Sequence, residues 1–184
     1  MVSFRNTLFA LMLLVSPATA LADQNDPRLG ELFRSLENAG DPGEAASLEQ
    51  EIWNIWHTAP NEELQGLLES GMAAMNRADF GHALDLFEQM TEIAPEYAEG
   101  WNKRATVHYI LNNFKESLAD IAETLKREPR HFGALSGKGL VHIRDDNFDA
   151  ALLAFEEALR VSPQNRGTNA HLKALKKILG QRDI

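Results

Sequence analysis

The chain has 184 residues with a formal net charge of −9, and its sequence contains no cysteine. The lack of cysteine excludes disulfides, thiolate catalysis and zinc–thiolate sites, so stability must come from packing. Acidic residues are concentrated between Asp23 and Glu96, and only the last stretch of the chain has a basic excess. Because phosphate neutralisation needs clustered lysine and arginine, no nucleic-acid partner is expected.

The first 22 residues have the pattern of a secretory signal peptide. A single cation, Arg5, precedes an apolar run over residues 8–15, and Ala20-Leu21-Ala22 supplies a small-residue cleavage site. We expect cleavage after Ala22 and export, with the bacterial periplasm as the location. A membrane anchor is the alternative, but the apolar run is shorter than the roughly 20 residues that span a bilayer.

Residues 23–63 predict a degenerate N-terminal helical hairpin. Apolar residues at helical spacing mark a short helix and, after a loop rich in Gly, Asp and Pro, a longer one: Leu29, Leu32, Phe33 and Leu36, then Ala45, Leu48, Ile52 and Trp56. We expect this hairpin to cap one end of the fold, with Trp53 and Trp56 in its packing.

Three units of 34 residues follow, at 64–97, 98–131 and 132–165. Each predicts a helix, a tight turn, a second helix and a proline stop. The residues that recur in register are Leu67, Gly71, Phe80, Ala83, Phe87 and Pro95; Trp101, Ala105, Phe114, Ser117, Ile121 and Pro129; and Leu135, Gly139, Phe148, Ala151, Phe155 and Pro163. No single unit can enclose its own apolar face, so the units must stack.

This period and pattern resemble the tetratricopeptide repeat (TPR) family. The resemblance implies an all-α fold, a solenoid of helix–turn–helix repeats with a right-handed superhelix. The stretch from Gly100 to Leu140 also resembles small exported proteobacterial proteins of that family. Trp101 is expected to be fully buried, so that its truncation to alanine would cost about 3–5 kcal/mol.

Residues 166–184 predict a C-terminal capping helix. Lys173, Lys176 and Lys177 lie outside, where they suit the helix macrodipole, and Gly180 is a stop signal. The apolar side of this helix is formed by Ala170, Leu172, Leu175, Ile178 and Leu179.

The sequence has no motif that indicates catalysis or a cofactor. It lacks a Gly-rich phosphate loop, a nucleophile elbow and an HExxH pair. His108 and His142 occupy equivalent positions in consecutive units, but helices pack about 8–10 Å apart, too far for shared metal ligation. We expect buried, hydrogen-bonded histidines, no metal site, no cofactor and no enzyme activity.

The family resemblance implies that the first helices line a concave groove. It places these residues there: Leu68, Met72, Met75, Asn102, Lys103, Thr106, Tyr109, Ile110, Ser136, Leu140, Ile143 and Arg144. Chaperone-binding members hold a carboxylate with a clamp of Lys, Asn and Arg, and that clamp is absent, because its positions are Leu68, Met72, Lys103, Gly133 and Gly137. The two glycines would let a partner backbone approach closely.

The expected function is a non-enzymatic protein-interaction scaffold that binds a peptide or helix of a partner in this groove. Three alternatives stay open: the N-terminal hairpin fills the groove itself, the protein is a subunit of a cell-envelope assembly complex, or it is an enzyme with an unrecognised site. No integral membrane segment is expected after signal cleavage.

Overall fold

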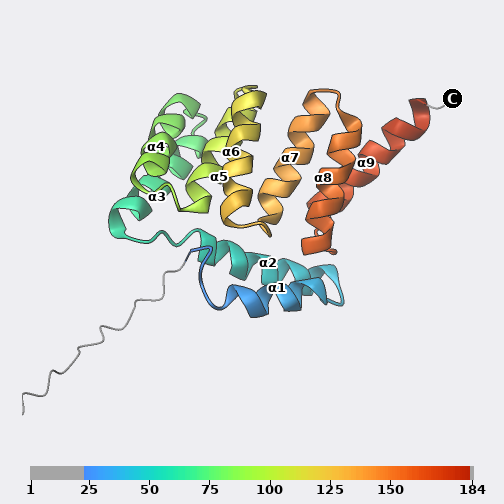
Figure 1. The fold of residues 1–184 in the computed structure, drawn as a ribbon, viewed down its shortest axis with the longest axis horizontal. Helices are drawn as coiled ribbons and strands as arrows, with labels where there is room; N and C mark the ends of the chain where they lie inside the picture. The colour runs from blue at the N-terminus through green and yellow to red at the C-terminus, as the bar shows by residue number, and fades with distance from the viewer. Residues whose placement is uncertain (1–22, 183–184) are drawn as a thin grey trace, which may run out of the picture.

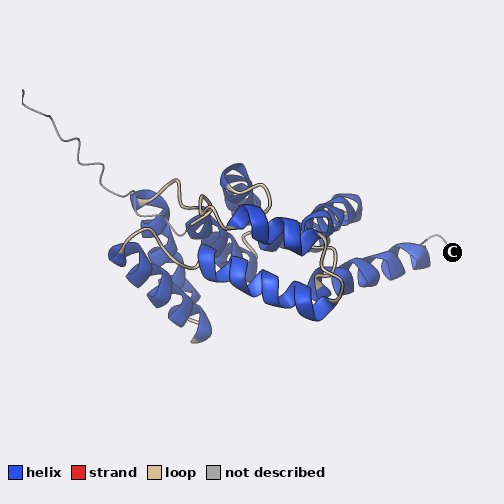
Figure 2. Cartoon of the chain, turned by 90° about the horizontal axis from the view of Figure 1, so that it is seen from below, coloured by secondary structure: helices blue, strands red, loops and turns tan. Residues whose placement is uncertain are grey.

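The computed structural model describes residues 23–182, and the predicted signal peptide lies outside this range. The described residues form nine α-helices and no strand, so the prediction of an all-α fold is confirmed (Figure 1, Figure 2). Three helix pairs, α3–α4, α5–α6 and α7–α8, stand side by side. The exact boundaries of the three 34-residue units stay a prediction. The helices are α1 (Leu29–Glu37), α2 (Pro42–Trp56), α3 (Glu62–Asn76), α4 (Phe80–Ile93), α5 (Ala98–Ile110), α6 (Phe114–Arg127), α7 (Phe132–Arg144), α8 (Phe148–Val161) and α9 (Arg166–Arg182).

Within each pair, a small residue on the first helix lies against a large one on the second. A Cβ atom added to Gly71 would lie 2.4 Å from the Phe87 ring, and the third pair repeats this contact. The middle pair has Ala105 at this position, and its second helix contributes the smaller Ile121 to the same cluster. The complementary sizes allow close packing, which explains why helix glycines recur at this spacing.

The turn inside each pair contains one residue with a left-handed backbone conformation. These residues are Ala78, Asn112 and Asp146, with φ angles of 58°, 62° and 55°. The following residue precedes the second helix, and the side chains of Asp79 and Asn147 accept a backbone N–H from its first turn. The three turns therefore share one geometry, as a repeat requires.

The sequence had suggested that the N-terminal hairpin of α1 and α2 caps one end of the stack, and the structure shows that it does not. Figure 1 shows both helices below the stack and crosswise to its helices, and Figure 2 shows the same arrangement from below. The apolar core of the hairpin, which includes Phe33, Ile52 and Trp56, also contains Phe132 of α7, and Val161 of α8 packs against it. The hairpin thus buries its apolar face against the third pair rather than against α3.

Polar contacts hold the hairpin at two separate places. The Tyr97 hydroxyl, just before α5, donates a hydrogen bond to the backbone oxygen of Trp56. In the segment between α8 and α9, Ser162 and Asn165 donate hydrogen bonds of 2.6 Å and 2.7 Å to the Glu49 carboxylate. The hairpin therefore connects the second pair with the far end of the third.

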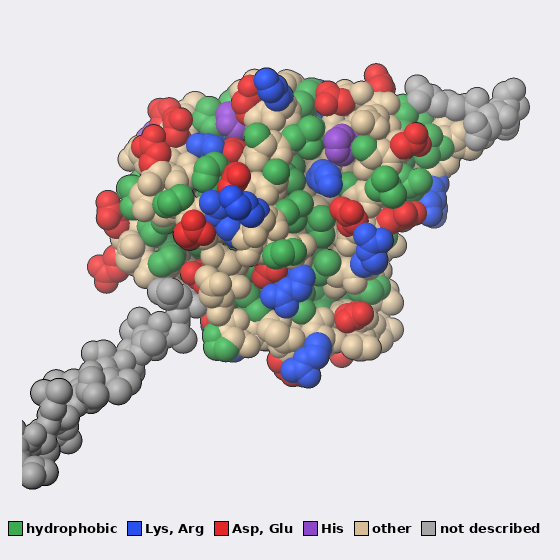
Figure 3. Space-filling view, in the orientation of Figure 1, with side chains coloured by type: hydrophobic (Ala, Val, Ile, Leu, Met, Phe, Trp, Pro, Cys, Tyr) green, Lys and Arg blue, Asp and Glu red, His purple; other side chains and the backbone are tan. Residues whose placement is uncertain are grey.

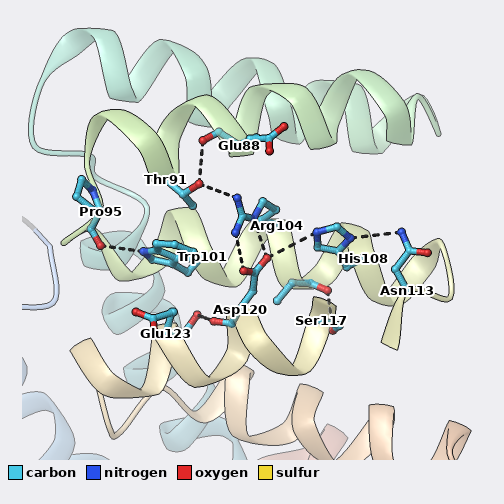
Figure 4. A network of polar contacts seen from close by, with 12 residues as sticks. Glu88, Thr91, Pro95, Trp101, Arg104, His108, Asn113, Ser117, Asp120 and Glu123 are labelled. Carbon is cyan, nitrogen blue, oxygen red and sulfur yellow. Dashed lines mark hydrogen bonds and ion pairs between the residues drawn. The ribbon is translucent and has the colours of Figure 1, made fainter. Parts of the chain in front are cut away.

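Trp101 is only partly buried, so the expectation of full burial is wrong. The guanidinium groups of Arg104 and Arg127 lie 4.8 Å and 5.1 Å from its ring centroid. Arg104 also donates two hydrogen bonds to the Asp120 carboxylate and one to the Thr91 hydroxyl, and so joins α5 to α6 and α4 (Figure 4). The tryptophan therefore lies in a cation–π arrangement beside a polar network, not in the apolar core.

Helix α9 packs on α8 at the C-terminal end of the stack, with Leu175 fully buried between them. The side chain of Ile178, which the sequence placed on the apolar side of this helix, is 41% exposed. In the orientation of Figure 3, charged side chains of both signs lie among apolar ones over the surface. No helix in residues 23–182 has the length and apolar character needed to span a membrane.

Candidate partner-binding groove

A cavity of about 310 Å³ lies between α5 and α7, and we call it the groove pocket. Trp53 of α2 forms one of its walls, and the start of α9 forms another. Its volume is at the lower end of the range of about 300–1,000 Å³ that is typical of ligand sites. The lining residues are Trp53, Asn102, Ala105, Thr106, Tyr109, Ser117, Ile121, Phe132, Gly133, Ala134, Ser136, Gly137, Leu140, Asn165, Gly167, Thr168 and His171.

Five of the predicted groove residues meet at this pocket. They come from the first helices of the second and third pairs, which the repeat pattern had placed along the groove. That a partner binds them stays a prediction. The five are Asn102, Thr106, Tyr109, Ser136 and Leu140.

The predicted residues of the first pair lie elsewhere. Leu68 is 1% exposed and belongs to the core between α3 and α4, and Met72 and Met75 pack against the same cluster. Their side chains therefore contribute to folding and do not line the pocket. Ile143 likewise packs against the cluster of α8 and α9, while Ile110 is 38% exposed at the end of α5.

The two predicted cations are already engaged inside the protein. Lys103 Nζ lies 3.0 Å from a carboxylate oxygen of Glu99. Arg144 donates a hydrogen bond of 2.6 Å to Asn112, and its guanidinium lies 5.1 Å from the ring centroid of Phe114. Neither side chain lines the groove pocket, and no Asp, Glu, Lys or Arg does.

Glu99 is the buried acid that joins the hairpin to the second and third pairs. One carboxylate oxygen lies 3.0 Å from both His57 Nε2 and Lys103 Nζ, and the other lies 3.0 Å from both His131 Nε2 and Asn102 Nδ2. Burial opposes ionisation, but the charge of Lys103 and the hydrogen bonds from the two histidines outweigh it. They hold the pKa of Glu99 well below its usual range.

His131, which the sequence did not single out, has a defined tautomer at this junction. Its Nδ1 accepts the backbone N–H of Ala134 at 3.1 Å, so the ring proton is on Nε2 and is donated to Glu99. The ring also stacks on Trp56, with centroids 4.0 Å apart. His131 thus caps α7 and fixes the hairpin against it. The only signal in the sequence was its position immediately before a helix.

Trp53 is the pocket residue that sequence reasoning assigned to another role. Its ring fills the space above Gly133, where an added Cβ atom would lie 2.7 Å from the indole. Gly133 therefore admits Trp53, not a partner backbone. Gly137 differs, because an added Cβ atom there would have only Ile121 within 4 Å, at 3.9 Å. The sequence left open whether the hairpin fills the groove, and the structure places one hairpin side chain, Trp53, in the wall of the pocket.

His108 and His142, which occupy equivalent repeat positions, have different polar neighbours. His108 Nε2 lies 3.8 Å from the Asp120 carboxylate, and its ring is only partly buried (Figure 4). Burial, together with the charge of Lys138, lowers the pKa of the partly buried His142. In the described part of the chain, no three His, Asp or Glu side chains are placed to hold a metal ion.

Stacked antiparallel helix pairs with a groove along their first helices define a helical-repeat solenoid. Residues 102–166 match the family described as Tetratricopeptide repeat. A TPR repeat-containing protein of Rhizobium etli is 33% identical over 156 residues, which cover 84% of this chain and 76% of the relative. The chain belongs to the tetratricopeptide repeat family.

Solved structures show the same fold. The Sgt2 TPR domain of Aspergillus fumigatus matches with a TM-score of 0.64 and 23% identity over 68% of this chain and 84% of that one. The first TPR of Spaghetti (RPAP3), bound to an HSP90 peptide, matches with a TM-score of 0.61 and 18% identity over 64% and 93% of the two chains. At these identities the likeness concerns the fold alone.

Proposed function

We propose that this protein is a non-enzymatic scaffold that binds a segment of a partner protein in the groove along α5 and α7. The groove pocket is the observation that carries the proposal, because it gathers residues of two successive repeats in one open cavity. The peptide bound to the RPAP3 domain supports a peptide ligand for this type of fold. The lining of the groove pocket contains no Asp, Glu, Lys or Arg, and this favours binding over catalysis there.

Site-specific photo-crosslinking in cells tests the proposal. A photoreactive benzoylphenylalanine replaces Thr106, which is exposed and lines the pocket, or Gln89, which is exposed on α4 outside it. We expect a discrete crosslinked product from position 106 only, and its loss when Tyr109→Ala is added. Equal products from both positions, or a product that Tyr109→Ala leaves unchanged, would contradict binding in this groove.

Lys103→Glu is a poor test of the same site. The substitution would place a second carboxylate against the buried Glu99, from which Lys103 Nζ is now 3.0 Å away. Lost binding would then reflect repulsion inside the protein. Tyr109 lines the pocket, packs against the apolar cluster that includes Ala105 and Ile121, and lies beside the ring of Phe114. Its truncation to alanine brings no charge into the protein, so it perturbs the fold less than Lys103→Glu does.

We also propose that the protein is exported to the bacterial periplasm, as its likeness to small exported proteobacterial TPR proteins suggests. The support is the pattern of residues 1–22, with its apolar run and the Ala20-Leu21-Ala22 site. Mass spectrometry of the protein from periplasmic extracts should give a mature chain that begins at Asp23. A full-length chain recovered from the cytoplasmic fraction would contradict export.

A further inference from the structure

We infer that the groove pocket receives one large uncharged side chain of the partner, aromatic or branched aliphatic, with Trp53 of the hairpin as part of its binding wall. This inference rests on the proposed function and specifies the chemistry of the partner residue. The repeats alone would not form this binding site, because residues of α2 and α9 complete the lining of the pocket.

The shape of the pocket favours a single bulky group. A volume of about 310 Å³ is too small for a helix and ample for one side chain. Gly137 leaves the floor open, since an added Cβ atom there would have only Ile121, at 3.9 Å, as a neighbour within 4 Å. Ala105 and Ala134 keep the adjoining surface low.

The electrostatics of the pocket disfavour a charged group. No lining side chain is an acid, a lysine or an arginine, and Lys103 and Arg144 are engaged by Glu99 and Asn112. A carboxylate or ammonium group placed here would lose water with no Asp, Glu, Lys or Arg in the lining to pair with it, which is unfavourable. His171, the remaining titratable side chain near neutral pH, stacks on Phe155. The pocket therefore selects against both acidic and basic anchors.

The hydroxyl groups of the lining are largely satisfied within the protein. Ser117 donates to the backbone oxygen of Ala105, and Thr106 donates to that of Asn102, each at 2.9 Å. Thr168 donates to Ser136 at 3.2 Å. With these donors engaged, recognition depends on contact area and shape more than on new hydrogen bonds.

Trp53 offers a preorganised wall. Its ring contacts those of Trp56, His57, His131 and Phe132, with centroids between 5.2 Å and 5.4 Å apart. Lys103 Nζ lies over the same ring, 5.6 Å from its centroid. An aromatic wall fixed by its neighbours loses little conformational entropy on binding, and aromatic anchors in desolvated pockets dominate binding energies.

The test is a selection from a random peptide library displayed on phage against the mature protein, with both free and amidated synthetic versions of the enriched peptides measured afterwards. Two variants accompany the wild type. Gly137→Leu fills the pocket floor, and Gly66→Leu changes an exposed helix glycine with nothing within 4 Å of an added Cβ atom. Circular dichroism and thermal melting establish that both variants are folded.

We expect enriched peptides to share one aromatic or large aliphatic residue. Their affinity should fall at least about tenfold for Gly137→Leu and stay unchanged for Gly66→Leu and after C-terminal amidation. Thr106→Glu, at an exposed position of the wall, should weaken the same peptides. Trp53→Ala should also reduce their affinity.

Other outcomes separate this inference from the proposed function. Peptides anchored by a free carboxylate, by Asp or Glu, or by Lys or Arg would overturn the uncharged pocket and leave peptide binding standing. Peptides that bind Gly137→Leu as well as the wild type would place the binding elsewhere and overturn the pocket assignment. A selection that enriches no peptide would count against both proposals.

Discussion

Ala78 is the one residue of the three left-handed turn positions whose side chain cannot form a hydrogen bond. Asn112 and Asp146 occupy the same left-handed position in the other two pairs, with φ near that of Ala78. Left-handed backbone costs an ordinary L residue roughly 1–2 kcal/mol, whereas asparagine and aspartate offset part of that cost with local hydrogen bonds. Ala78 therefore carries strain that its counterparts avoid.

We expect Ala78→Asn to raise the free energy of unfolding by roughly 0.5–1 kcal/mol, measured by urea denaturation. A matched control is Ala73→Asn, at an exposed and helical position of α3, where poorer helix propensity should lower stability by about 0.5 kcal/mol. A loss of stability in both variants would show that the turn is not strained.

Glu99 gives the protein a pH dependence whose sign is fixed. Its folded-state pKa lies below the ordinary value, so the ionised carboxylate stabilises the folded state. That stabilisation is complete above the unfolded pKa of about 4.3 and is lost as the pH falls through the folded value. Acid therefore weakens the junction between the hairpin and the second and third pairs.

We expect Glu99→Gln to lower the free energy of unfolding at pH 7, because removing one partner of a buried pair costs about 3–5 kcal/mol. The difference from the wild type should shrink as the pH falls below the unfolded pKa of about 4.3. Urea denaturation at several pH values measures it, and Glu37→Gln, at an exposed position, is the control. A pH-independent difference would contradict the linkage, since Asp26 and Glu123 contribute equally to both proteins.

Single positions were predictable from the sequence where recurrence defined a packing contact. Gly71 and Gly139 recur at one position of the repeat, and Phe87 and Phe155, which recur at another, are the rings that fill the space beside them. Trp101 was not predictable in the same way, because its environment depends on Arg104 and Arg127, which no repeat position specifies. Apolar contacts between the helices of a pair recur with the 34-residue period and can be predicted from it. Polar partners such as Arg104 and Arg127 are set by residues that do not recur.

At the scale of the elements, the helices of the repeats follow from local sequence and the position of the hairpin does not. Periodicity, turn residues and prolines define α3 to α8. The hairpin is placed by contacts between residues far apart in the chain, such as Trp53 with Gly133 and Glu49 with Ser162. No local pattern encodes such contacts. The sequence therefore predicted the pocket residues on α5 and α7, but not those that α2 and α9 contribute.

The contact of Trp53 with Gly133 makes the docking of the hairpin sensitive to one methyl group. An added Cβ atom at position 133 would lie 2.7 Å from two carbons of the indole, whereas Gly137 offers open space. We expect Gly133→Ala to displace Trp53, and hydrogen exchange measured by mass spectrometry should quicken in α1 and α2 while α3 to α6 keep their protection.

Gly137→Ala is the control for this experiment, since both glycines lie in α7 and both gain helix propensity from alanine. Exchange in the hairpin should stay as in the wild type for this variant. Equal exchange in the two variants would show that the hairpin does not depend on the fit of Trp53 against Gly133.

At the scale of the whole molecule, the hairpin acts as a brace along the stack. It is bound near the start of α5 through Tyr97 and Glu99, and before α9 through Ser162 and Asn165. Repeat stacks otherwise hold together only through contacts between neighbours. A brace that spans two pairs limits how far they can move apart, and so keeps the groove pocket at one width.

The brace can be tested by distance measurements on spin-labelled protein. The sequence has no cysteine, so Ala73→Cys on α3 and Ala174→Cys on α9, both exposed, can be labelled without side reactions. We expect one narrow distance distribution in the otherwise wild-type protein. Glu49→Ala removes the acceptor of two hydrogen bonds and should broaden that distribution, with a loss of about 1–3 kcal/mol in stability.

Glu51→Ala is the matched control, because Glu51 is an exposed acid on the same helix and lies two residues from Glu49. Its distance distribution should equal that of the wild type, since it takes no part in the contacts with Ser162 and Asn165. If Glu49→Ala also leaves the distribution narrow and centred at the same distance, the spacing of the repeats is set by their own stacking. The width of the groove would then follow from the repeat contacts alone, without help from the hairpin.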